Sequence, residues 1–257
     1  MNTPLLLTSA LLAHVPHAFS TRVGGVSRGV FASLNLGNPS GLAGDARDPV
    51  ANIRENLARI TSAMGRGGRE IVQVHQVHGA EVLTVRGGDP THAHAGDTKA
   101  DAIVSDDPAR VLCVRVADCA PVLLADEAGR VVATVHAGWR GVIADVVTAA
   151  VNQMRALGAG PINAAVGPCI GPERFEVGPE VAAEFHRVFG SPGVVIAGGA
   201  KDRVDLKAAL REQLSRAGVA GIDVLPHCTV SEPELFFSHR RDQGLTGRTG
   251  AFIATRE

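Results

Sequence analysis

Three side chains that commonly bind transition metals lie in short glycine- or proline-containing segments: His78 in HQVHG, Cys119 in ADCAP and His136 in HAGWRG. One thiolate and two imidazoles suit zinc, and three protein ligands leave a fourth position open, as in catalytic zinc sites. Because the three residues are far apart in the sequence, the whole fold must bring them together. The sequence therefore predicts a catalytic zinc site.

A hairpin explains how Cys119 and His136 meet. The segment DEAG, residues 126–129, separates two apolar runs and is typical of a four-residue turn. If Ala125 faces Arg130, counting outward places Cys119 opposite His136, where Cβ atoms are ~5 Å apart. A register shift of two residues would keep both side chains on the same face of the sheet.

The third ligand comes from HQVHG. His75 and His78 are three residues apart, so in an extended strand they face opposite sides and only one can join the site. We favour His78, because it precedes Gly79 at the expected strand end. His92 and His94, in a glycine-rich loop, have the form of an accidental surface pair.

Each predicted ligand also has a structural explanation. A histidine at a strand end is often held by hydrogen bonds, and a cysteine in an apolar strand is often a small buried hydrophobe. Cys119 and His136 could also act as the nucleophile and base of a cysteine hydrolase. A third ligand at His78 favours the metal.

Arginines beside glycine or hydroxyl residues provide a second signal, because their planar guanidinium groups bind phosphate or carboxylate through two hydrogen bonds. Candidates for substrate binding are Arg22, Arg140 and Arg240, with further arginines at Arg241 and Arg248. Arg22 and Arg140 are the candidates for binding an anion. Trp139 has two possible roles, as a wall of the substrate site or as packing beneath a helix that starts near Val142, and we favour the second. Ordinary surface ion pairs are the alternative for any one of these arginines.

Composition indicates a soluble protein that acts on small molecules. The chain has 257 residues, 45% of them hydrophobic, and 25 lysines and arginines nearly balance 26 aspartates and glutamates. Such a balance gives no field that would attract nucleic acid or an anionic membrane. The cysteines form no CxxC pair and no stretch is long enough to span a bilayer, so we expect a cytoplasmic protein. Nothing in the sequence indicates the oligomeric state.

Hydrophobic periodicity predicts an α+β protein, a single domain over residues 1–257. The first helix is expected to begin at Asp48-Pro49 and to extend to Met64. Further helices are predicted at 143–157, 179–189 and 206–218. Strands are predicted at 71–77, 81–85, 100–105, 111–117, 120–125, 130–136, 162–167, 194–197, 221–226 and 251–256.

The chain resembles the laccase-domain proteins, a family labelled polyphenol oxidase and associated with purine nucleoside phosphorylase activity. The resemblance extends from about Phe19 to the C-terminus. It rests on the ordered motifs FSTRVGGVS, SLNLG, HQVHG, ADCAPVLLAD, HAGWRG, GPCIGPERFEVGPEV, FFSHRRD and TGR. The family usually has tyrosine where this chain has Phe175 and His239.

The resemblance implies a single domain with α/β/β/α layers and zinc ligands at His78, Cys119 and His136. It implies phosphorolysis of adenosine, inosine, guanosine and methylthioadenosine, with purine nucleosides and phosphate as the small-molecule partners. Deamination of adenosine is a companion activity of the family. However, the HxE and PCxxC signature of zinc deaminases is missing, so that step would need another proton carrier.

Two other functions are compatible with parts of the sequence. A multicopper oxidase needs many histidines, usually in His-x-His pairs, and only His92 and His94 have this form. Copper is therefore disfavoured as the cofactor. A relative linked to editing of peptidoglycan precursors raises the alternative of a hydrolase that uses Cys119 and His136.

Overall fold

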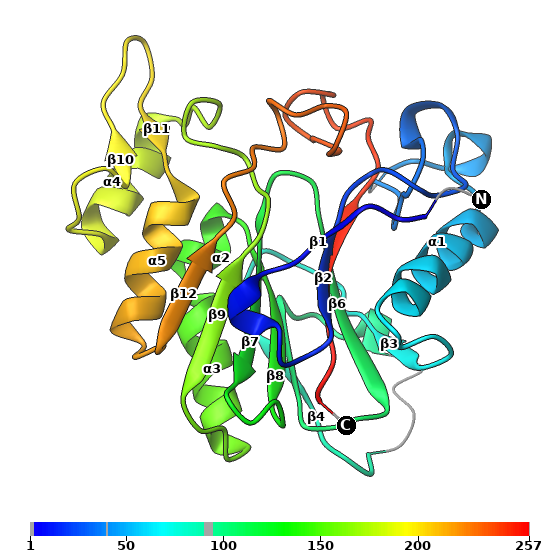
Figure 1. Cartoon of the computed structure of the whole chain (residues 1–257). Helices are drawn as coiled ribbons and strands as arrows, with labels where there is room; N and C mark the ends of the chain where they lie inside the picture. Colours follow the sequence, from blue (N-terminus) through cyan, green and yellow to red (C-terminus); the bar gives the residue numbers. More distant parts are fainter. Residues whose placement is uncertain (1–2, 40, 90–94, 257) are drawn as a thin grey trace.

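Two β-sheets lie face to face at the centre of the computed structural model, which describes residues 3–39, 41–89 and 95–256 (Figure 1). The larger sheet has six strands in the order β12-β9-β7-β8-β5-β4. Their bounds are β4 Val82–Val85, β5 Ala102–Ser105, β7 Ala120–Asp126, β8 Val132–Ala137, β9 Ile162–Val166 and β12 Gly221–Val224. Every residue of β7 and β8 is buried, because other layers cover both faces of these central strands.

The second sheet has five strands in the order β1-β2-β13-β6-β3. Their bounds are β1 Leu6–Leu7, β2 His17–Ser20, β3 Glu70–Val72, β6 Arg110–Val116 and β13 Thr249–Ile253. Strands β10 (Val195–Ile196) and β11 (Arg203–Val204) form a separate antiparallel pair. Both large sheets contain parallel and antiparallel neighbours, as expected of an α+β protein.

Helices cover the outer face of each sheet. Four helices lie on the side of the larger sheet: α2 Trp139–Ile143, α3 Val146–Ala156, α4 Pro179–Val188 and α5 Leu206–Arg216. Helix α1 (Val50–Ala63) packs on the smaller sheet through Leu57 and Ile60. Short 3-10 helices are η1 Ala10–Leu12, η2 Gly29–Phe31, η3 Gly44–Ala46 and η4 Ala95–Asp97. The predicted α/β/β/α layering is confirmed.

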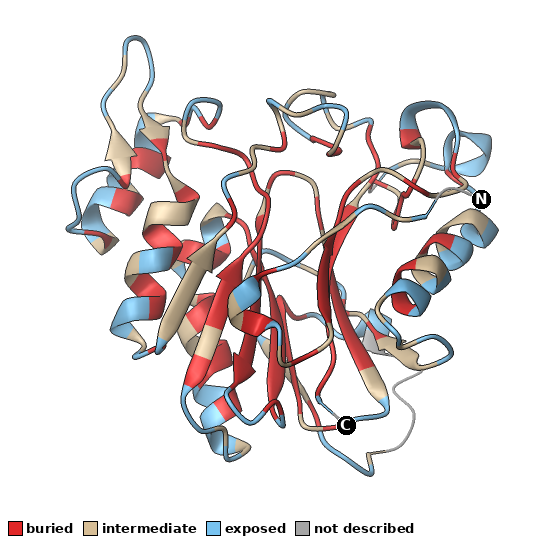
Figure 2. Ribbon diagram, viewed as in Figure 1, coloured by how far each residue is buried: buried red, intermediate tan, exposed pale blue. Residues whose placement is uncertain are grey.

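Apolar side chains fill the space between the sheets. Phe19 and Ile253 from the smaller sheet share this core with Leu123 and Ala165 from the larger sheet, and all four are at most 1% exposed. Figure 2 shows buried residues running the length of the central strands, while the helices alternate between buried and exposed faces. The sheets therefore form a rigid support for the loops at their ends.

Several predicted boundaries need correction. The strand predicted at 71–77 ends at Val72, and the one predicted at 251–256 runs from Thr249 to Ile253. The helix predicted at 143–157 begins instead at Trp139 and is interrupted before α3 by Asp145, whose φ is 59°. Strands β1, β2 and β11 are additions to the predicted set, since two to four residues are too few to show periodicity.

Within the part of the chain that the structure describes, no helix has the length and apolar character needed to cross a membrane. Near the N-terminus, the apolar residues Leu6 and Leu7 form β1, which pairs with β2.

The close packing of Gly167, after β9 of the larger sheet, against Phe19 of the smaller sheet can be tested by substitution. A Cβ atom there would overlap the ring of the buried Phe19, so we expect Gly167→Ala to lower the free energy of unfolding by about 1–3 kcal/mol. Gly160→Ala is the matched control, because no atom lies within 4 Å of the point that its Cβ would occupy. Denaturant unfolding measures both variants, and equal stabilities would contradict the assigned packing.

Candidate metal centre and substrate cavity

Three potential metal ligands meet where the β7–β8 hairpin of the larger sheet approaches the loop between β3 and β4. His78 lies after β3, Cys119 directly precedes β7, and His136 lies in β8. One ligand atom from each residue lies within 4.8 Å of the others, and Cys119 Sγ is 3.8 Å from His78 Nε2. The sequence-predicted trio is therefore assembled at one point.

The hairpin that brings Cys119 to His136 has a longer loop than predicted. Ala125 pairs with Val132 rather than Arg130, and Pro121, not Cys119, faces His136. The predicted register was wrong by two residues, because the carboxylate of Asp126 accepts two backbone N–H groups beyond the expected turn. An even shift preserves the face of each side chain, so the two ligands still meet.

His78 is held by backbone hydrogen bonds rather than by a strand. Its φ is 63°, a left-handed conformation that is uncommon for a residue other than glycine. The carboxylate of Asp101 accepts hydrogen bonds from the backbone N–H groups of Val77 at 3.2 Å, His78 at 2.9 Å and Gly79 at 2.6 Å. This carboxylate therefore fixes the loop that carries the first ligand.

Asp101 also orients His136. Its Oδ1 lies 2.8 Å from His136 Nδ1, which leaves Nε2 of that imidazole to face the metal position. Asp101 is fully buried. Burial acts to raise the pKa of Asp101, but the hydrogen bonds from His136 and the backbone of Gly79 outweigh it and lower the pKa. Asp101 therefore remains a carboxylate and holds two of the three ligands.

Cys119 and His136 stabilise each other's charged forms. Burial would raise the pKa of the Cys119 thiol, but the charge of His136 and hydrogen bonds from both histidines lower it to about 6. Burial would lower the pKa of His136, but the Cys119 thiolate and Asp101 raise it. A thiolate is the form of cysteine that binds metal, and a metal ion that binds here would displace the proton of His136.

Asp118 fixes the backbone next to Cys119. Its φ is 86°, and its carboxylate accepts hydrogen bonds from Thr229 Oγ1 and from the backbone N–H of Arg240, both at 2.6 Å. Its carbonyl accepts a hydrogen bond from Ile170 N at 2.9 Å. Asp118 therefore connects the segments of Ile170, Thr229 and Arg240 next to the Cys119 thiolate. The sequence alone did not indicate this role.

A cavity of about 830 Å³ opens over the three ligands. Its apolar lining includes Ile170, Phe175, Leu206 and Leu245, together with Trp139, which also packs partly against the core. Its other polar lining residues include His75, Gln76, Asp118, His239 and Gln243. His75 and His78 thus line the same cavity, and their predicted placement on opposite faces is wrong because β3 ends before either residue.

Of the three arginines predicted for substrate binding, only Arg240 lines this cavity. Arg22 donates to the carbonyls of Ala32 and Pro233, and Arg140 stacks over Trp139 at 4.3 Å from the ring centroid. Arg140 is the second residue of a five-residue helix rather than a residue preceding it. The structure therefore places Arg22 and Arg140 outside the described cavity lining.

Two arginines outside the predicted site set do line the cavity: Arg115 in β6 and Arg248 before β13. Arg115 stands within an apolar strand without a recognition motif. Arg248 stands in the TGR motif, but only the pairing of β13 with β6 brings it to the site. His92 and His94 lie outside the described residues.

The donor set fits zinc. Two imidazoles and a thiolate beneath a wide cavity match a three-ligand site with an accessible fourth position. The same donors occur in blue-copper centres, which add a weak axial ligand, often methionine. Among the described residues that line the cavity, none is a methionine. The geometry thus favours a substrate-accessible site over an electron-transfer centre.

Comparisons with known proteins agree with the motifs. A family described as multi-copper polyphenol oxidoreductase laccase matches residues 16–256. The chain is 42% identical over 242 residues to a Deinococcus radiodurans protein named purine nucleoside phosphorylase, and the alignment covers 93% of this chain and 88% of that protein. It is 40% identical over 235 residues to Escherichia coli purine nucleoside phosphorylase YfiH, with 91% of each chain covered.

Two solved structures have a similar fold over nearly the whole chain. YlmD from Geobacillus stearothermophilus matches with a TM-score of 0.86 and 30% identity over 100% of both chains. Neisseria meningitidis protein NMB0706 matches with a TM-score of 0.81 and 34% identity, covering 99% of this chain and all of that one.

Individual ligand substitutions test the metal centre. We expect His78→Ala and His136→Ala to lose most of the bound metal, because each removes one of three donors. His75→Ala is the control: it lines the same cavity but does not belong to the donor cluster. Elemental analysis of the purified proteins measures this, and equal metal loss in all three variants would contradict the assignment.

Substitution of Asp101 tests its positioning role. We expect Asp101→Asn to weaken metal binding about 10- to 100-fold, because the amide cannot accept every hydrogen bond that the carboxylate does. Competition with a chromogenic chelator gives the affinity, and the exposed Asp97→Asn is the control. A folded Asp101→Asn protein with unchanged affinity would show that the ligands do not depend on this carboxylate.

Proposed function

Because the chain belongs to the family described as multi-copper polyphenol oxidoreductase laccase, whose relatives include proteins named purine nucleoside phosphorylase, we propose that it is a zinc-dependent purine nucleoside phosphorylase. Its substrates in this proposal are inorganic phosphate and adenosine, inosine, guanosine or methylthioadenosine. The products are the free purine and the corresponding ribose 1-phosphate.

One observation carries the proposal: the donor trio lies in the wall of a cavity that combines apolar surfaces with cationic side chains. A nucleoside offers a flat apolar base and a polar sugar, and phosphate offers negative charge. A cavity of about 830 Å³ has the size of sites that enclose ligands of this class. Phe175 and Trp139 provide aromatic surfaces against which a purine can pack.

Phosphorolysis places clear demands on the chain. A phosphate oxygen forms a bond to C1′ of the ribose while the bond from C1′ to the purine nitrogen breaks, and the purine leaves with the electron pair. The departing base then needs a proton or a hydrogen-bond donor. His75 and His239 both line the cavity, and either imidazole can supply that donor. His239 thus offers a polar group where the family usually has tyrosine.

Zinc would be held by His78, Cys119 and His136, with Asp101 fixing the tautomer of His136. When bound, the ion would supply Lewis-acid polarisation of a substrate oxygen. The protein's own contribution is to position the reactants. Asp118 holds Cys119 and the backbone of Arg240 together, so the ligand and the cavity wall keep one geometry.

The alternatives predict different products. A copper polyphenol oxidase would oxidise phenols and contain several copper ions. A cysteine hydrolase acting on peptidoglycan precursors would use Cys119 as a nucleophile and His136 as its base. The 3.8 Å approach of His78 to the thiol favours metal binding over that nucleophilic role. Adenosine deaminase activity would give inosine without consuming phosphate.

A product assay tests the proposed function. Purified protein is incubated with a panel of nucleosides, with and without phosphate, and the products are separated by chromatography. We expect base and ribose 1-phosphate only when phosphate is present, and at least a hundredfold loss of rate in Cys119→Ser, which exchanges the soft thiolate for a poor zinc ligand. Phosphate-independent products, or an unchanged Cys119→Ser enzyme, would contradict the proposal.

A further inference from the structure

Arg115 and Arg248 line the cavity without a carboxylate partner. Within the described ranges, no ion pair joins either guanidinium to an aspartate or glutamate. Asp118, the aspartate that lines the same cavity, already accepts hydrogen bonds from Thr229 and from the backbone of Arg240. Two cations that line one cavity without forming an ion pair are suited to binding an anion.

Strand pairing brings the two arginines to the same face. Arg115 in β6 faces Gly250 in β13, and Arg248 lies two residues before that glycine. Side chains related in this diagonal way lie about 7–8 Å apart at their bases, within reach of long side chains that converge on one ligand. Because Gly250 has no side chain, β13 does not cover Arg115 at its pairing position.

Each arginine is held in place by its surroundings. Gln76 bonds to both backbone groups of Arg115, accepting from its N–H at 2.9 Å and donating to its carbonyl at 2.7 Å. A Cβ atom on Gly37 would lie 3.0 Å from Arg115 Nη1, so the guanidinium passes close over that glycine. Arg248 Nη1 donates to the carbonyls of Thr246 and Gly247. Its other guanidinium nitrogens have no protein partner among the described residues.

The electrostatics agree with this geometry. Burial lowers the pKa of Arg248, and the charge of Arg115 lowers it further, while Cys119 and Asp118 act in the opposite direction. Arg248 is therefore close enough to feel both the second arginine and the thiolate of the metal centre. An anion between the two guanidinium groups would relieve their repulsion beside the proposed zinc ligands.

We propose that Arg115 and Arg248 form the phosphate-binding subsite of this cavity, in place of the Arg22 and Arg140 pair that the sequence suggested. The assignment rests on the proposed function for its role in catalysis, but the anion site itself rests on the two guanidinium groups. Their forks can each donate two hydrogen bonds to phosphate oxygens. Phosphate held there lies in the same cavity as the ligand cluster, where a nucleoside can meet it.

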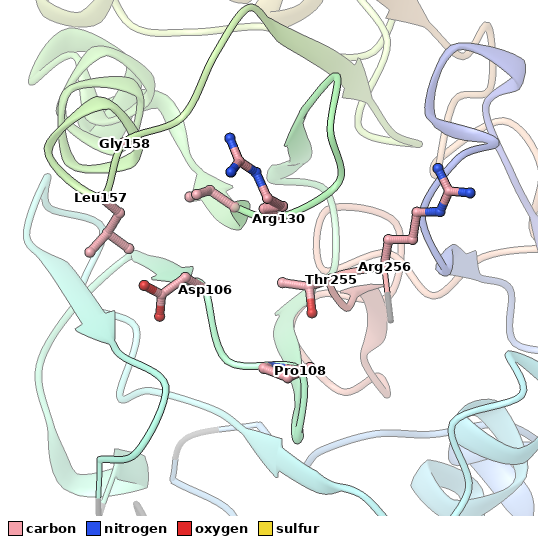
Figure 3. A pocket seen from close by; sticks show the side chains of 8 residues that line it. Asp106, Pro108, Arg130, Leu157, Gly158, Thr255 and Arg256 are labelled. Carbon is pink, nitrogen blue, oxygen red and sulfur yellow. The ribbon is translucent and has the colours of Figure 1, made fainter.

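A second pocket, of about 400 Å³, also contains two arginines, but it lies apart from the metal ligands. Arg130 and Arg256 are among the residues that line it, and both are exposed (Figure 3). Figure 3 shows the guanidinium of Arg256 directed away from the side chains of Asp106 and Thr255. Arg130 precedes β8, whereas His136 lies near its other end, about 20 Å away along an extended chain. Arg130 is therefore a suitable control.

Direct binding tests the subsite without requiring turnover. Inorganic phosphate is titrated into the zinc-loaded protein by calorimetry, with zinc content and melting temperature measured for every variant. We expect Arg115→Ala and Arg248→Ala each to weaken binding about 10- to 100-fold, the loss expected for a hydrogen bond between charged groups. Arg130→Ala should bind phosphate as the unsubstituted protein does.

Gly37→Ala is a subtler test, because it keeps both charges. The added Cβ would crowd Arg115 Nη1, so the guanidinium shifts by a few tenths of an ångström and phosphate binding should weaken slightly while zinc content stays constant. It also tests the subsite independently if the arginine variants fail to fold. Unchanged phosphate affinity in folded, zinc-loaded Arg115→Ala and Arg248→Ala would overturn the subsite, even if the protein phosphorolyses nucleosides. Arginine-dependent phosphate binding without phosphorolysis would support the subsite and instead reject the proposed function.

Discussion

The carboxylate of Asp101 is the interaction on which the metal centre depends. It accepts backbone N–H groups from the loop that carries His78 and a ring N–H from His136, which lies in a strand of the larger sheet. A buried carboxylate is costly unless every lone pair is used, and here four donors from two segments use them. Burial of the carboxylate therefore constrains the positions of both segments, because displacement of either one would leave some of its lone pairs without a hydrogen-bond donor.

The sheets explain why residues so distant in sequence can share one site. Strands β7 and β8 form a buried hairpin, with Cys119 just before one strand and His136 near the end of the other. The smaller sheet packs against this hairpin through Phe19 and Leu123, and its strand β6 carries Arg115 to the same end of the structure. Well-packed layers change shape little, so the cavity keeps its arrangement before substrate arrives.

The main helices and strands and the candidate metal ligands could be predicted from the sequence because they leave local signals, whereas the order of the layers came from the family resemblance. Apolar periodicity marks strands and helices. The predicted register was wrong by an even number of residues, so Cys119 and His136 still lie on the same face of the sheet. Asp101 and Arg115 leave no such signal, and the TGR motif of Arg248 did not show that it lines the cavity. Their roles come from long-range contacts, such as the pairing of β13 with β6, across more than a hundred residues of chain. The choice of His78 over His75 as a ligand agrees with the donor cluster, but the reason given for it was wrong, because β3 has three residues and gives way to irregular backbone before reaching either histidine.

The charge around the cavity is a local property of the fold. The whole chain has a formal net charge of −1, yet Arg115, Arg240 and Arg248 gather at one cavity that also contains Asp118 and the Cys119 thiolate. The aspartate accepts hydrogen bonds from Thr229 and from the backbone of Arg240, and the negative charge of the thiolate is stabilised by the two histidines. The positive charges of the arginines that line the cavity have no carboxylate partner among the described residues. A nearly neutral protein can thus present a concentrated positive site to an anionic substrate, since within about 10 Å the arrangement of charges matters more than their sum.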